Sequence, residues 1–139
     1  MTNKTSFSKL THQEVIHIFL GCLAGYDRRA RQTAEAAMRI LQKAQIPFTI
    51  LAEEEVCCGD TAHRVGDFTT AQKVKEINKK NLLKNHIKKM YVLSPHCFST
   101  FKNDFSSDEF ENIQIFPLLD LVDDLLRSGA IKLAGSIEK

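Results

Sequence analysis

Three features that would assign the chain to a membrane, to export or to nucleic acid are missing from its 139 residues. No apolar run approaches the roughly 20 residues that a membrane-spanning helix needs. The opening residues Met1 to Thr5 carry no apolar signal-peptide core. The net charge of +2 is too small to indicate a nucleic-acid partner. We therefore expect a cytoplasmic protein, peripheral to a membrane only through partner subunits.

Internal repeats and low-complexity segments are also missing. The composition, with 43% hydrophobic and 26% charged residues, fits one globular domain with a core of its own. We expect a lead-in over residues 1–14, a domain over 15–133 and a tail over 134–139.

Strand-like and helix-like segments alternate along the chain. β-branched and aromatic runs predict strands over residues 15–20, 48–52, 89–93 and 113–116. Helices are predicted after the caps Asp27 and Asp60, over residues 70–85, and after Pro117 at a first helical position. This alternation predicts an α/β fold: an open, mostly parallel four-stranded sheet with helices on both faces, in a Rossmann-like three-layer arrangement.

All four cysteines follow predicted strands. Cys22 comes after the first strand, Cys57 and Cys58 after the second, and Cys97 after the third. Because the carboxyl ends of parallel strands share one edge of the sheet, these cysteines are expected to gather there. Four thiolates suit an iron–sulfur cluster or a zinc ion. Structural disulfides are disfavoured, since the domain lacks an export signal and two of its cysteines are adjacent.

The spacing of these cysteines resembles the CCG motif of heterodisulfide reductase subunits. The motif appears here as Gly21-Cys22, then Cys57-Cys58-Gly59-Asp60, then Ser94-Pro95-His96-Cys97, with spacers of 34 and 35 residues. Iron–sulfur subunits of glycolate, lactate and anaerobic glycerol-3-phosphate oxidation share this pattern. The resemblance covers about residues 15–133. It implies a cysteine-rich module that binds an iron–sulfur cluster and transfers electrons.

One residue departs from the family pattern. Ser94 stands where the motif has the first cysteine of Cys-x-x-Cys. Relatives with five cysteines can hold an unusual cluster at a disulfide-cleaving site, and four cysteines leave enough ligands for an ordinary four-iron cluster or for zinc. We expect Ser94 to be a turn residue before Pro95, and we do not expect the domain to be catalytic alone.

Polar residues near the cysteines are candidates for tuning the centre. His63 and His96 could ligate metal or hydrogen-bond a sulfur, and Gly59 follows the cysteine pair directly. Arg64 and Lys102 could offset thiolate charge. For each histidine a capping or surface role is an alternative, and for Arg64 and Lys102 the alternative is a surface salt bridge.

Three functions remain open from the sequence. The first is an electron-transfer module with an iron–sulfur cluster, the second a structural zinc domain, and the third a thiol switch. The resemblance further implies a partner, either a second module of the same kind or a redox subunit of the flavoprotein or ferredoxin type. It also suggests that residues 134–139 form the link to a missing second module.

Overall fold

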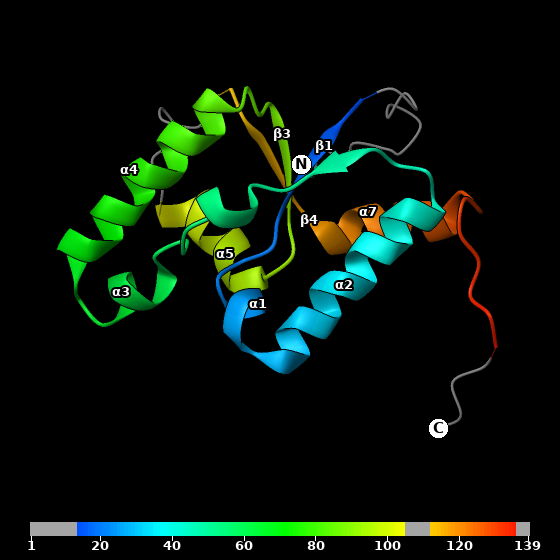
Figure 1. Cartoon of the computed structure of the whole chain (residues 1–139), viewed down its shortest axis with the longest axis horizontal. Coiled ribbons are helices and arrows are strands. Elements are labelled where there is room, and N and C mark those ends of the chain that lie inside the picture. Colours follow the sequence, from blue (N-terminus) through cyan, green and yellow to red (C-terminus); the bar gives the residue numbers. More distant parts are fainter. Residues whose placement is uncertain (1–13, 105–111, 136–139) are drawn as a thin grey trace.

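The computed structural model describes residues 14–104 and 112–135. At its centre lies a four-stranded, wholly parallel sheet in the order β2-β1-β3-β4 (Figure 1). The strands are Ile16–Phe19 (β1), Phe48–Thr49 (β2), Lys89–Val92 (β3) and Gln114–Pro117 (β4). The predicted α/β class and parallel sheet are confirmed.

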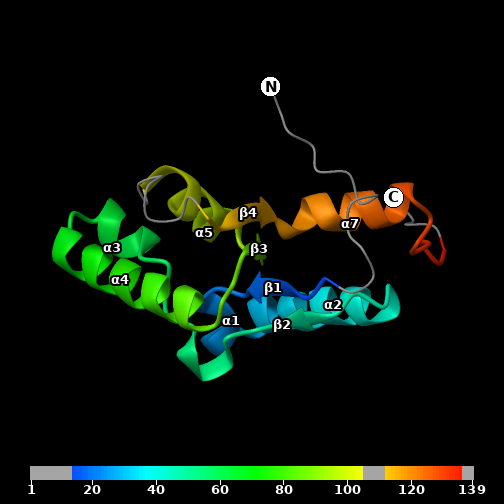
Figure 2. The same cartoon turned by 90° about the horizontal axis from the view of Figure 1, so that it is seen from above.

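Helices cover both faces of this sheet, as predicted. Helices α2 and α7 lie on one face, and α4 and the segment after β3 lie on the other (Figures 1 and 2). Their buried side chains form two separate cores on the two faces. The helices are α1 (Leu23–Tyr26), α2 (Arg28–Lys43), α3 (Asp60–Arg64), α4 (Phe68–Lys84), α5 (Pro95–Ser99) and α7 (Leu118–Arg127). A 3-10 turn, η2 (Ala52–Glu54), and a π-helical turn, η3 (Thr100–Asp104), complete the described elements.

Strand β1 is buried on both sides because it lies inside the sheet. Ile16 and Ile18 pack toward α2 and α7, whereas Phe19 packs into the opposite core. There the Phe19 ring meets Phe101 of η3 edge to face, with ring centroids 4.9 Å apart. Both layers are therefore anchored on the strand that leads to the first cysteine.

Two helix starts follow the predicted side-chain pattern closely. The carboxylate of Asp27 accepts a hydrogen bond from Ala30 N at 2.8 Å, so Asp27 caps α2 as predicted. Helix α7 buries Leu118, Leu121 and Leu125. Pro117 lies at its N-cap, one residue before the predicted position, because its extended backbone still belongs to β4.

Several predicted boundaries were wrong. Strands β1 and β3 end one residue earlier than predicted, and β4 starts and ends one residue later. Strand β2 ends at Thr49 rather than at residue 52, because Ala52 has a positive φ of 51° and the chain turns into η2. Asp60 is the first residue of α3 and not its cap; Gly59 takes the cap position, and Asp60 binds Arg64 instead. Helix α4 begins at Phe68, not residue 70, because the Asp67 carboxylate caps Thr70 N.

No described helix is long and apolar enough to cross a membrane. The predicted lead-in up to residue 13 and residues 136–139 of the predicted tail lie outside the described residues.

One buried titratable group in β1 gives the fold a pH dependence. His17 is 2% exposed, its Nδ1 lies 3.2 Å from Thr49 Oγ1, and burial lowers its pKa to about 4. Unfolding restores an ordinary pKa of about 6.5, so the unfolded chain binds the extra proton first as pH falls. We expect the free energy of unfolding of metal-free protein to drop by about 2 kcal/mol between pH 7 and pH 5 from this group.

Urea unfolding at both pH values checks this expectation, with His17→Asn as the test variant. The asparagine keeps a polar group near Thr49 but does not titrate, so the variant should lose about 2 kcal/mol less than the wild type over the same pH interval. His86→Asn, at an exposed position, is the control. Equal losses in wild type and His17→Asn would contradict the assignment.

Candidate metal centre

The strand order places a crevice at the carboxyl edge of the sheet. Strands β1 and β3 are neighbours at the centre of the sheet. After β1 the chain continues to α2 on one face, and after β3 it continues to α5 on the other face. Ligands of open α/β sheets bind where two neighbouring loops diverge in this way. A cavity of about 470 Å³ lies at this position. Its lining includes all four cysteines with Gly21, Tyr26, Ser94, Pro95 and His96.

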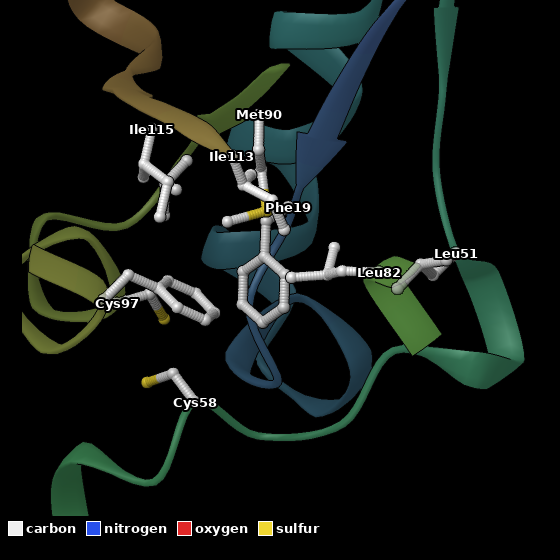
Figure 3. Close-up of a cluster of buried hydrophobic side chains, with 10 residues drawn as sticks. Phe19, Leu51, Cys58, Leu82, Met90, Cys97, Ile113 and Ile115 are labelled. Atoms are coloured by element: carbon white, nitrogen blue, oxygen red, sulfur yellow. The ribbon is translucent and has the colours of Figure 1, made fainter. Parts of the chain in front are cut away.

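The four cysteines form two pairs around this cavity. The Sγ atoms of Cys22 and Cys57 are 3.6 Å apart. Cys58 and Cys97 are buried and hydrogen-bonded to each other. Figure 3 shows the Cys58 and Cys97 sulfurs close together, in the core that also contains Phe19. The cysteines therefore converge as predicted. The adjacent residues of the pair have different partners, since Cys57 contacts Cys22 and Cys58 contacts Cys97.

A half-buried carboxylate, that of Glu55, holds the loop that carries Cys22. Glu55 accepts a hydrogen bond from Leu20 N at 3.0 Å and one from Gly21 N at 2.7 Å. Burial raises the pKa of Glu55, and the two N–H donors only partly oppose this shift. Because Glu55 also lies two residues before Cys57, it ties the first two cysteine segments together.

Helix α4 fixes the segment that carries the cysteine pair. Asn78, which is fully buried, donates from Nδ2 to the Cys57 carbonyl at 2.9 Å. One turn further on, Asn81 donates to the Glu54 carbonyl at 2.7 Å. These two amides satisfy carbonyls in an irregular segment whose backbone has no strand partner there.

Gly59 is required by backbone conformation and by space. Its φ is +91°, and its N–H donates to Cys57 Sγ at 3.4 Å. A Cβ at this position would lie 2.9 Å from Val74 Cγ2 of α4. The glycine therefore lets α4 approach the cysteine pair closely.

Gly59→Ala is expected to lower the free energy of unfolding by more than about 2 kcal/mol, because the side chain adds both left-handed strain and a clash. Gly66→Ala is the matched control, since Gly66 has a φ of +83° but open space at its Cβ. That variant should lose only about 1 kcal/mol, from strain alone. Urea denaturation of both measures the difference, and equal losses would show that the contact with Val74 costs nothing.

Hydrogen bonds make the sulfurs unequal in acidity. The Cys97 thiol donates to Cys58, and together with Asp60 N–H and the Thr100 hydroxyl this lowers the pKa of Cys58 to about 7. The same bond, with burial, raises the pKa of Cys97. Burial chiefly, and then Cys22, raise the pKa of Cys57 to about 11. The bond between the Cys97 and Cys58 side chains therefore favours the thiolate form of Cys58 over that of Cys97.

The other predicted site residues differ in whether they line a cavity beside the cysteines and in which side chain they bind. His96 lines the cavity but is largely exposed, with Nδ1 3.7 Å from Asp60 Oδ2. His63 pairs with Asp104 at 3.9 Å and lines a second cavity of about 210 Å³ that also reaches Cys58. Arg64 Nε binds Asp60 Oδ1 at 2.7 Å, so Arg64 forms a surface salt bridge, which was the alternative to offsetting thiolate charge. Lys102 is exposed and lines neither cavity.

Several residues that contact the cysteines were missed by sequence reasoning. Glu55, Tyr26, Asn78 and Thr100 all bind a cysteine or the loop that carries it. The acidic run Glu53-Glu54-Glu55 was visible, but nothing in the sequence marks which of its members is turned inward. Tyr26 follows Cys22 by one helical turn, a spacing that brings side chains together on a helix.

The donor set of this cavity identifies the class of group it could hold better than the spacing of its sulfurs does. Among residues 14–104 and 112–135, no three His, Cys, Asp or Glu side chains approach closely enough to hold one metal ion. A tetrahedral zinc site with bonds of about 2.3 Å would need all four sulfurs within about 4 Å of each other. The Cys22–Cys57 separation of 3.6 Å lies within this limit, and four soft thiolates facing one cavity suit an iron–sulfur cluster as well as zinc.

Comparison with known proteins identifies the family. The pattern of the CCG cysteine-rich domain matches residues 16–102, which include all four cysteines. The chain belongs to the CCG cysteine-rich domain family.

Several proteins similar to this CCG domain are named as oxidoreductases or their subunits. It is 30% identical over 83% of its length to EtfAB:quinone oxidoreductase of Syntrophomonas wolfei, covering 16% of that protein. It is 31% identical over 94% of its length to a subunit of the dihydromethanophenazine:CoB--CoM heterodisulfide reductase of Methanosarcina acetivorans, covering 33%. It is 28% identical over 82% of its length to FadF of Bacillus subtilis, a probable iron–sulfur-binding oxidoreductase, and covers 16% of that protein. The chain thus spans a third or less of these relatives. No solved structure matches it.

Proposed function

We propose that this CCG domain binds an iron–sulfur cluster through Cys22, Cys57, Cys58 and Cys97 and acts as an electron-transfer module. The observation that carries the proposal is that all four cysteines line one cavity at the sheet's switch point. The names of the relatives, which include iron–sulfur-binding and heterodisulfide-reducing proteins, support the same cofactor class. When bound, such a cluster supplies reversible one-electron transfer.

The residues of the chain supply position and shielding. Glu55 and Asn78 hold the two cysteine loops, while Phe19 and Phe101 fill the core behind Cys58 and Cys97. The four thiolates suit either metal class, and the iron–sulfur name of a relative favours a cluster over a zinc ion. His63 and His96 act as polar neighbours of the site and not as ligands.

The proposed role is that of one component in a larger oxidoreductase. Because the chain spans a third or less of the relatives named above, its electrons come from and pass to other parts of such an assembly. Those parts would be a second CCG module, or a flavoprotein or ferredoxin-like subunit. The isolated domain is then expected to be redox-active without turning over a substrate.

Anaerobic purification and reconstitution, followed by metal analysis and a visible spectrum, test the proposal. About four iron and four sulfide per chain, with a broad absorbance that dithionite bleaches, would support it. One zinc per chain without colour would replace it with the structural function. Absence of both metals after reconstitution would sink both.

The second candidate, a thiol switch, is favoured by one distance. Cys22 Sγ and Cys57 Sγ are 3.6 Å apart, so these two cysteines, rather than the adjacent Cys57 and Cys58, are placed to form a disulfide. In that reaction an oxidant such as diamide takes two electrons and two protons from the thiols. Mass spectrometry of diamide-treated, metal-free protein would locate a Cys22–Cys57 bond if this function applies.

A further inference from the structure

Two hydroxyl groups beside the cysteines have no part in the ligand set. Tyr26 Oη lies 3.6 Å from Cys22 Sγ, one turn further along α1. The Ser94 side chain hydrogen-bonds Cys97. Gly21 lies against both of these residues, since a Cβ added to it would be 3.3 Å from Cys97 Sγ and 3.8 Å from Ser94 Cβ. Each hydroxyl therefore reaches a different sulfur, one from each cysteine pair.

Both hydroxyls act as donors. A tyrosine hydroxyl keeps its proton at neutral pH, and a serine hydroxyl does not ionise. A sulfur that ligates metal has no proton of its own to give, so it can only accept. Thr100 also hydrogen-bonds Cys58, but its single proton is shared with Asp60 Oδ1 at 3.3 Å and the His96 carbonyl at 3.1 Å. Thr100 is for this reason the weaker donor.

We propose that the Tyr26 and Ser94 hydroxyls tune the centre, raising its reduction potential by donating hydrogen bonds to the Cys22 and Cys97 sulfurs. This inference rests on the proposed cluster. Reduction adds one electron, and part of the added charge falls on the ligand sulfurs, where a donor stabilises the reduced state more than the oxidised state. Ser94 thus has a role other than that of a ligand. It stands where the family motif has the first cysteine of Cys-x-x-Cys, and it donates a hydrogen bond to the second, Cys97.

Tyr26→Phe and Ser94→Ala test the proposal, because each removes one oxygen and leaves all four cysteines. Iron and sulfide are measured first, and then the midpoint potential is determined by anaerobic titration followed by absorbance. We expect wild-type iron content and a lower midpoint potential in both variants, with the two decreases adding in the double variant because the sulfurs belong to separate pairs.

Matched controls are available in the chain. Tyr91→Phe alters a tyrosine buried in the other core, and Ser99→Ala alters a serine of α5 that does not line the cavity. Neither should move the potential. A fully loaded variant with an unchanged or higher potential would overturn the tuning role while leaving the cluster intact. Loss of iron from Tyr26→Phe or Ser94→Ala would also overturn it, by making the hydroxyl a structural group or a ligand. Failure of the wild type to take up iron would instead refute the proposed function.

Discussion

Replacing Cys22 with alanine is expected to reduce the iron and sulfide retained after anaerobic reconstitution at least tenfold. Cys22 is the most suitable cysteine to remove, because it is half-exposed, whereas Cys58 and Cys97 belong to a hydrophobic core and their loss would also destabilise the fold. With three sulfurs left, one corner of a four-iron cluster has no protein ligand. Iron and sulfide assays, together with the visible spectrum, measure the result.

Leu23→Ala is the control for this prediction. Leu23 follows Cys22 directly, lines the same cavity and is 54% exposed, so its removal perturbs the loop without removing a sulfur. It should load as the wild type does. Wild-type iron content in Cys22→Ala, with a native circular dichroism spectrum, would show that Cys22 is not a ligand.

Glu55→Ala is expected to lower the free energy of unfolding by at least about 2 kcal/mol and to weaken metal loading as well. The substitution leaves Leu20 N–H and Gly21 N–H without their acceptor and frees the loop that carries Cys22. Hydrogen bonds to charged groups contribute about 1.5–3 kcal/mol each, and the burial that raises the pKa of Glu55 offsets part of that gain. Urea unfolding of metal-free protein and iron analysis after reconstitution measure the two effects.

The neighbouring Glu53 gives a matched control. It lies in the 3-10 turn just before Glu55 and is exposed, so Glu53→Ala should change stability by no more than about 0.5 kcal/mol. If Glu55→Ala behaved like Glu53→Ala, the carboxylate would have no part in holding the Cys22 loop.

The location of the cysteines could be predicted because it depends on sheet topology. Strand-like runs before Cys22 and Cys97 place those residues at one edge of a parallel sheet whatever the details of the loops. Cys57 was a less direct case. Strand β2 ends eight residues before it. The segment between them turns through η2, where Ala52 has a positive φ, and α4 holds it through Asn78.

By itself, the sequence determined the α/β class, the Asp27 cap of α2 and the edge at which the cysteines meet. These follow from side-chain periodicity and from the common direction of parallel strands, both of which are local properties of the chain. Tertiary structure decided how the cysteines pair, that Glu55 rather than Glu53 turns inward, that Asp60 binds Arg64 rather than capping a helix, and that Ser94 and Tyr26 reach sulfurs. Each of these depends on contacts between segments that packing brings together, and in such contacts burial and available space outweigh local preference.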